Sequence, residues 1–99
     1  MLKVLVADDD ATLRLSVTSA LLAAGDFQVE EAVNGQDAID KFKAGSFQVV
    51  LLDVDMPQKT GLEALKEIKE EDPSAIVLIM TAYANVNDAV HAVKEGAFD

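Results

Sequence analysis

The sequence predicts an α/β domain built on a parallel sheet with helices on both faces. Short apolar runs alternate with segments of helical periodicity along the chain, so that a strand is followed by a helix four times over. This alternation is typical of parallel strands joined by right-handed helical crossovers. The chain has 99 residues, of which 51% are hydrophobic and 26% charged, so one globular domain spanning residues 1–99 is expected.

The first predicted strand, residues 2–7 (LKVLVA), is a short apolar run that contains two valines. From Ala11 the apolar residues fall at helical spacing, and Gly25 can end this first helix. Residues 27–32 (FQVEEA) alternate in polarity, which indicates a second strand that lies nearer a sheet edge.

The second predicted helix follows a turn or cap at Asn34-Gly35 and ends near Gly45. Its inward-facing residues at helical spacing are Ala38, Ile39 and Phe42. Residues 49–52 (VVLL) are apolar throughout, as expected of a strand that is covered on both faces.

The third predicted helix begins with a capping box, in which Thr60 and Glu63 form the T-x-x-E pattern, and Pro73 ends it. We expect its inward-facing residues to be Leu62, Leu65 and Ile68. Residues 75–81 (AIVLIMT) predict the fourth strand, and a fourth helix follows and ends at Gly96. The inner stripe of that helix is Val86, Ala89, Val90 and Val93.

Composition and charge argue against several classes of protein. The formal net charge of −10 argues against direct nucleic-acid binding, which needs Lys and Arg on the phosphates. Without cysteine the chain has no disulfide framework and no thiolate zinc site. No apolar run approaches the roughly 20 residues of a membrane span, and the start is too short and acidic for a signal peptide. A cytoplasmic protein with no membrane partner is therefore expected.

Acidic residues follow the predicted first and third strands. Asp8 and Asp9 come directly after the first strand, and Asp53 comes directly after the third. Ligands of open α/β sheets bind beyond the carboxyl ends of the strands. If these two strands are neighbours, about 4.8 Å apart, the three carboxylates share one small pocket. Such carboxylates repel unless a cation intervenes, and oxygen ligands of this kind suit Mg²⁺, which is the expected cofactor.

Taken alone, the Asp8-Asp9-Asp10 triplet fits a solvated loop with a helix cap better than a metal site. The metal interpretation is favoured once Asp53, at the end of the third strand, and Thr81, at the end of the fourth, are considered with the triplet. Asp10 itself is expected to be a cap or a surface acid.

Five segments of the chain resemble the receiver domain of two-component response regulators. They are LVADDD, AVNGQDAI, VVLLDVDMPQKTGLEAL, IVLIMTAY and AVKEGAFD, and the likeness extends along the whole chain. The last part is most similar to receivers of NtrC-type transcriptional activators. The resemblance implies a flavodoxin-like (CheY-like) doubly wound parallel sheet with strand order 2-1-3-4.

The resemblance also implies roles for single residues. Asp53 matches the phosphoacceptor, whose carboxylate takes a phosphoryl group from a sensor histidine kinase. Asp9 matches a direct Mg²⁺ ligand and Asp8 a ligand that acts mainly through water. Asp55 matches the position whose backbone carbonyl reaches the metal. Such a receiver accepts and relays a phosphoryl group and is not an enzyme.

Two further residues match the switch segment of the family. Thr81 matches the switch hydroxyl that turns toward the phosphoryl oxygens, and Ala82 matches the small residue that leaves room for them. The family pattern continues beyond Asp99 with a strand ending in Lys-Pro and a fifth helix, and that lysine has no counterpart here. Lys94 is the nearest candidate to replace it but is expected to be solvated. A truncated receiver lacking the last strand–helix unit is therefore expected, with weak or absent phosphorylation.

The same end point predicts self-association. Without a fifth strand the fourth strand becomes a long, flat, apolar edge, which tends to recruit another strand. Leu15 and Leu22 form a stripe on the first helix that a fifth helix covers in the family. We expect a homodimer or higher oligomer through these two surfaces.

Two other functions remain open at the level of sequence. LLDVDMP also resembles the motif of haloacid dehalogenase-like phosphatases, with Asp53 and Asp55 as its acids and Thr81 as the second motif. That motif should follow the first strand, however, and a catalytic lysine and further acids are missing. The remaining alternative is a scaffold that has kept the motif but is not phosphorylated.

Overall fold

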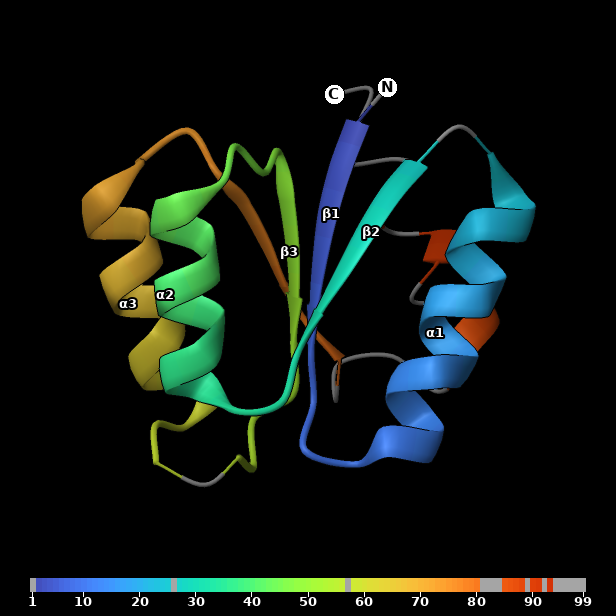
Figure 1. The fold of residues 1–99 in the computed structure, drawn as a ribbon, viewed down its shortest axis with the longest axis horizontal. Coiled ribbons are helices and arrows are strands. Elements are labelled where there is room, and N and C mark those ends of the chain that lie inside the picture. Colours follow the sequence, from blue (N-terminus) through green and yellow to red (C-terminus); the bar gives the residue numbers. More distant parts are fainter. Residues whose placement is uncertain are drawn as a thin grey trace.

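The fold is a four-stranded parallel sheet between two helical layers (Figure 1). The computed structural model describes residues 2–25, 27–56, 58–80, 85–88, 90, 91 and 93. Its elements, in order, are β1 (Leu2–Ala7), α1 (Ala11–Ala24), β2 (Phe27–Ala32), α2 (Gly35–Ala44), β3 (Val49–Leu52), α3 (Gly61–Glu71) and β4 (Ile76–Ile79). The strand order is β2-β1-β3-β4 with every pair parallel, so the predicted α/β fold and the order 2-1-3-4 are confirmed.

The sheet separates two apolar clusters. In Figure 1, α1 lies on one side of the sheet, and α2 and α3 lie together on the other. Leu5 and Ala7 of β1 face the cluster on the α2–α3 side, whereas Val4 and Val6 face the cluster on the α1 side. All four residues of β3 are fully buried, as predicted for a strand covered on both faces. The two central strands are thus fixed from both faces.

The fourth predicted helix is described only in part. Residues 86–88, 90, 91 and 93 are helical. Val90 and Val93 are buried in the cluster on the α1 side of the sheet, in agreement with the predicted inner stripe. Gly96, at which this helix was expected to end, lies outside the described residues.

Leu62 was predicted to face inward, and this is wrong because 57% of its surface is exposed. The inward face of α3 begins one residue earlier, at the buried Gly61, and continues through Ala64 and Ile68 with Leu65 half-buried. Since an α-helix turns about 100° per residue, a stripe that starts at Gly61 leaves Leu62 in solvent.

The fourth strand is shorter than the predicted residues 75–81. It spans Ile76–Ile79, and these four residues pair with the four residues of β3. The length of β4 is therefore set by its neighbour and not by the longer apolar run. Ala75 precedes the strand, Met80 lies in a 3₁₀ turn, and Thr81 falls outside the described residues.

Both helices of the α2–α3 layer begin with satisfied caps. The Asn34 side chain accepts a hydrogen bond from Asp37 N at 2.7 Å. At the start of α3, Thr60 Oγ1 accepts from Glu63 N at 3.3 Å, and Glu63 Oε1 accepts from Thr60 N at 3.1 Å. The predicted capping box is confirmed, and these caps hold the two helix starts at the carboxyl edge of the sheet.

Helix α1 differs from α2 and α3 in its surface. It carries a single charged residue, Arg14, and has Leu15 and Leu22 exposed at 61% and 55%. The predicted apolar stripe is therefore present. No helix among the described residues is long and apolar enough to cross a membrane.

Candidate metal centre at the carboxyl edge of the sheet

Three carboxylates meet where β1 and β3 end. Asp8 follows β1 and Asp53 follows β3, and these strands pair in register so that Ala7 lies beside Leu52. One carboxylate oxygen from each of Asp8, Asp9 and Asp53 lies within 4.8 Å of the other two. The sequence-based expectation that these three acids share one pocket therefore agrees with the geometry.

Backbone hydrogen bonds extend the sheet to the first residue past each strand. Asp53 N donates to Ala7 O at 3.0 Å, and Asp8 N donates to Ala32 O at 3.1 Å. The main chains of Asp8 and Asp53 are thereby fixed by neighbouring strands. The separation of these two residues is set by the sheet and does not depend on a loop.

Asp8 is the buried member of the cluster, with 1% of its surface exposed. Its Oδ1 accepts a hydrogen bond from Asp10 N at 2.9 Å. Its Oδ2 is buried and has no hydrogen-bond partner among the described residues. A buried carboxylate oxygen without a partner is costly, and a bound cation is one way to satisfy it.

The pKa of Asp8 is raised to about 6, mainly by burial and further by the nearby carboxylates of Asp53, Asp9 and Asp10, against the lowering effect of the hydrogen bond from Asp10 N. Burial is also the main reason that the pKa of Asp53 is raised, with Asp9 and Asp55 adding to it. The site therefore resists full ionisation, and a divalent cation would remove both the repulsion and part of the desolvation penalty.

Asp10 does not belong to the cluster of three acids. Its Oδ1 accepts hydrogen bonds from Thr12 N at 2.9 Å and Leu13 N at 3.2 Å, so it is the N-cap of α1. One of the two roles expected for Asp10 is thus confirmed.

Of the remaining predicted site residues, the structure describes only Asp55. The Asp55 side chain is exposed and lies outside the group of three. Thr81, Ala82 and Lys94 lie outside the residues that the structure describes.

The loop after Asp53 is held close to the helix starts. Gly61 N donates to Val54 O at 2.9 Å, and a Cβ atom on Gly61 would lie 2.1 Å from Asp53 O. Met56 is buried, and Lys59 forms an ion pair with Glu67 of α3. Gln58 adopts a positive φ of 72°, a conformation that most side chains disfavour. This loop is therefore shaped by contacts at both of its ends.

Sequence reasoning missed Arg14. Its Nη1 donates to Asp8 O at 2.7 Å, and its Nε donates to Glu31 Oε1 at 2.8 Å. An arginine in the first turn of a helix usually reads as a surface residue. The only signal available was its position four residues after the acidic triplet.

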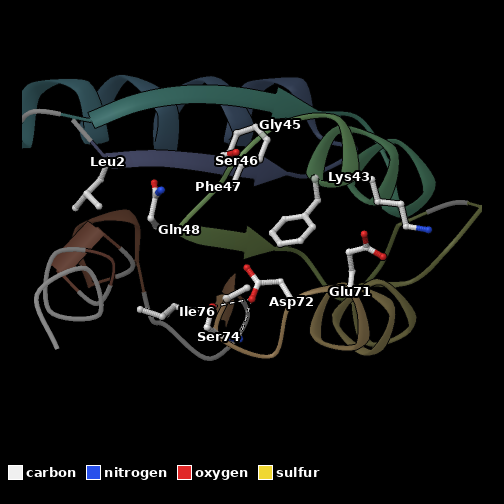
Figure 2. Close-up of a pocket in the computed structure, with 12 residues that line it drawn as sticks. Leu2, Lys43, Gly45, Ser46, Phe47, Gln48, Glu71, Asp72, Ser74 and Ile76 are labelled. Atoms are coloured by element: carbon white, nitrogen blue, oxygen red, sulfur yellow. Dashed lines mark hydrogen bonds between the residues drawn. The ribbon is translucent and has the colours of Figure 1, made fainter.

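A pocket of about 600 Å³ lies at the opposite end of the sheet (Figure 2). It is bounded by the first residues of β1 and β4, Leu2 and Ile76, and by Lys43 and Glu71 near the ends of α2 and α3. None of the three clustered acids lines it. Its charged groups are of both signs, and its size alone assigns it no ligand.

Residues 4–99 match the family of response regulator receiver domains. The chain belongs to this family. Over 96 residues it is 45% identical to the transcriptional regulatory protein ZraR of Klebsiella oxytoca, covering 97% of this chain and 21% of ZraR. It is 34% identical to the chemotaxis protein CheY of Thermotoga maritima, covering 98% of this chain and 81% of CheY. The chain thus spans about a fifth of the length of ZraR.

The solved structures agree with this assignment. The response regulator TrrA of Thermotoga maritima, in complex with Mg²⁺ and BeF, is 34% identical, with a TM-score of 0.77 over 85% of this receiver and 72% of that chain. A complex of histidine kinase ThkA with TrrA also matches, at 33% identity and a TM-score of 0.75 over 80% of this receiver and 67% of that chain. The predicted receiver resemblance is therefore confirmed. The name of ZraR fits the likeness to receivers of transcriptional activators.

Proposed function

We propose that residues 1–99 act as one phosphoacceptor unit and that Asp53 takes its phosphoryl group from the histidine of a sensor kinase. The observation that supports this most is that one carboxylate oxygen from each of Asp8, Asp9 and Asp53 lies within 4.8 Å of the others, while a buried Asp8 oxygen has no hydrogen-bond partner in the described part of the chain. Asp8 is closed off from solvent, and the exposed Asp9 is proposed as a metal ligand, so the half-buried Asp53 is the proposed acceptor for an incoming phosphohistidine.

The proposed transfer needs a fixed carboxylate. One oxygen of Asp53 attacks the phosphorus of the phosphohistidine, so that a P–O bond forms while the P–N bond breaks. The leaving imidazole nitrogen takes up a proton, and Asp53 becomes an aspartyl phosphate. The buried strand β3 and the bond from Asp53 N to Ala7 O hold the nucleophile against movement during this step.

We assign Asp9 as a direct Mg²⁺ ligand, Asp8 as a ligand mainly through water, and Asp53 and the Asp55 carbonyl as further ligands. An all-oxygen donor set fits this hard cation. When bound, Mg²⁺ would supply positive charge to the carboxylates and to the phosphoryl oxygens. The crystal structure of TrrA with Mg²⁺ and BeF supports this part of the proposal by analogy.

The proposed partner is a sensor histidine kinase, by analogy with the ThkA–TrrA complex. Thr81 is proposed as the switch hydroxyl, and Ala82 as the small residue beside it. In this proposal the domain accepts a phosphoryl group and is not an enzyme that turns over a substrate. Self-association through β4 and the stripe of Leu15 and Leu22, weak phosphorylation and a cytoplasmic location stay predictions.

The experiment is phosphorylation of the 99-residue polypeptide by phosphoramidate, with and without Mg²⁺, followed by mass spectrometry. We expect a Mg²⁺-dependent gain of one phosphoryl group in a small fraction of the molecules, which Asp53→Asn abolishes. Asp55→Asn is the matched control, because its exposed side chain is not needed in this mechanism. A phosphoryl group that survives in Asp53→Asn would overturn the assignment. Binding of beryllium trifluoride, followed by fluorine NMR, checks the same site when the phosphorylated yield is small.

The phosphatase alternative is disfavoured by the position of its motif. It requires the acids to follow the first strand, whereas Asp53 follows β3. Steady turnover of p-nitrophenyl phosphate that is lost in Asp53→Asn would restore it.

A further inference from the structure

We infer that Arg14 is a positioning residue for the metal centre, which holds the main chain of Asp8 and ties it through Glu31 to strand β2. The inference rests on the proposed Mg²⁺ site. It concerns a residue that neither binds the ion nor touches the phosphoryl group.

One guanidinium group makes both contacts. Arg14 Nη1 donates to the carbonyl oxygen of Asp8 at 2.7 Å, and Nε donates to Glu31 Oε1 at 2.8 Å. Only 15% of the Arg14 side chain is exposed, so these bonds are largely shielded from water. Glu31 pairs with Val6 in the β1–β2 register, two residues before Asp8. The contacts therefore link α1, β1 and β2 at the acidic edge.

The bond to Asp8 O acts on two of the proposed ligands. The carbonyl of Asp8 and the N–H of Asp9 belong to one planar peptide unit, so fixing that carbonyl restricts the backbone on both sides of it. Asp8 is otherwise held by the bond from its N to Ala32 O and by the bond from Asp10 N to its Oδ1. Of these three restraints, the one from Arg14 is the only one that a side chain from α1 supplies.

The charge of Arg14 and its position predict opposite changes in Mg²⁺ affinity when Arg14 is removed. Its positive charge opposes a nearby cation, so on electrostatic grounds alone its removal would strengthen Mg²⁺ binding. Glu31 pairs with that charge and reduces the conflict. If Arg14 instead holds the backbone of Asp8 and Asp9 in the geometry that binds Mg²⁺, its removal weakens Mg²⁺ binding. Lysine keeps the charge but lacks the planar fork that reaches two acceptors, so Arg14→Lys should fail as a substitute.

The test is the Mg²⁺ dissociation constant by calorimetry for the wild type, Arg14→Met, Arg14→Lys and Glu31→Gln. We expect Arg14→Met and Arg14→Lys to bind about tenfold more weakly, as is usual when a group that orients a ligand is lost. Glu31→Gln should show a smaller loss. Lys3→Met is the matched control: Lys3 lies at the start of β1, away from the acidic edge, and pairs with Glu30 of β2, so its loss should not weaken binding. Equal or tighter binding in Arg14→Met overturns the inference.

A second measurement, made without metal, separates this inference from the proposed function. In Arg14→Met we expect the amide resonances of Asp9 and Asp10 to shift and the Asp10 amide to exchange faster, because its acceptor Asp8 Oδ1 is no longer fixed. Asp9→Asn removes a ligand and should leave Asp10 exchange unchanged. If the wild type fails to bind Mg²⁺, the metal assignment fails while this measurement still decides the role of Arg14. Unchanged Asp9 and Asp10 amides in a folded Arg14→Met protein contradict that role.

Discussion

The acidic edge, formed by Asp8, Asp9 and Asp53, and the α2–α3 layer differ in how their carboxylates are paired. In the layer, hydrogen bonds from Thr60 lower the pKa of Glu63. Just after α3, hydrogen bonds from Ser74 likewise lower the pKa of Asp72. At the edge, burial raises the pKa of Asp8 to about 6 and also raises that of Asp53.

The difference shows that the acids of the edge lack the stabilising partners that acids near the helices have. In and beside the helical layer, Glu63 and Asp72 accept hydrogen bonds from Thr60 and Ser74, and Asp37 and Glu67 pair with lysines. Such partners help to hold a helix end or a loop. The acids of the edge face one another, and one buried oxygen has no partner among the described residues. Local violations of this kind are expected at functional sites, where a ligand supplies what the fold omits.

The two regions meet at Gly61, and the largest effect is expected there. In Gly61→Ala a Cβ atom would lie 2.1 Å from the carbonyl oxygen of Asp53, so α3 must move away from the edge. We expect the free energy of unfolding to fall by about 3 kcal/mol or more. Urea unfolding followed by circular dichroism measures it.

Gly25→Ala is the control for that substitution. Its new Cβ atom would lie 3.4 Å from the Phe27 ring, and Gly25 has an extended φ of 171° that alanine can adopt. A comparable loss of stability in both variants would show that the contact with Asp53 is not the cause.

Asp8→Asn tests how much the acidic edge lowers the free energy of unfolding. Because the pKa of Asp8 is raised in the folded state, the metal-free protein is stabilised by protonation and loses that stability as the pH rises through about 4 to 6. Above that window the ionised carboxylate destabilises the fold, and asparagine removes the charge. We expect Asp8→Asn to raise the free energy of unfolding by about 2 kcal/mol near neutral pH, and by little below about pH 4.

Urea titrations at several pH values, with Mg²⁺ chelated, measure this gain. Glu70→Gln, an exposed change in α3, is the control for the removal of a surface carboxylate. A destabilised Asp8→Asn at neutral pH would break the comparison, since Asp8 would then behave like the paired acids.

Thr60→Ala measures the contribution of a satisfied cap. It removes one half of the capping box at the start of α3, so we expect a loss of about 1 kcal/mol in unfolding free energy. Thr12→Ala, an exposed change within α1, should cost less. If the loss of stability in Thr60→Ala is independent of Mg²⁺, the cap acts separately from the acidic edge. If added Mg²⁺ restores the lost stability, the two regions are coupled and the comparison is weakened.

The smallest effect is expected for the ion pair of Lys59 and Glu67. Both side chains are about one-third exposed, so solvent screens their attraction. Glu67→Gln should lower the free energy of unfolding by about 0.5 kcal/mol or less, and added salt should reduce the difference. Differential scanning calorimetry at low and high salt measures it. A loss as large as that of Thr60→Ala would show that the pair shapes the loop after Asp53.

The sequence predicted the positions of the acids because β1 and β3 are short apolar runs whose ends are unambiguous. It failed at Leu62, since the pattern of leucines gave no sign that Gly61 packs inward against Asp53. It also missed the pairing of Arg14 with Glu31, which lie 17 positions apart and meet only once α1 is placed beside β2. The raised pKa of Asp8 depends on burial, which spacing along the chain does not give.

The uniform composition of β3 has a consequence for how the domain can change over evolution. All four residues of β3 are aliphatic, so a shift of its register by one residue would still place aliphatic side chains on both faces of the sheet. The side chains alone therefore do not specify which residue of β3 lies beside which residue of the neighbouring strands. Alignment depends on the polar flanks: Gln48 N donates to Lys3 O at one end, and Asp53 N donates to Ala7 O at the other. Aliphatic substitutions inside the strand can therefore accumulate, whereas inserting or deleting one residue would separate Asp53 from Asp8.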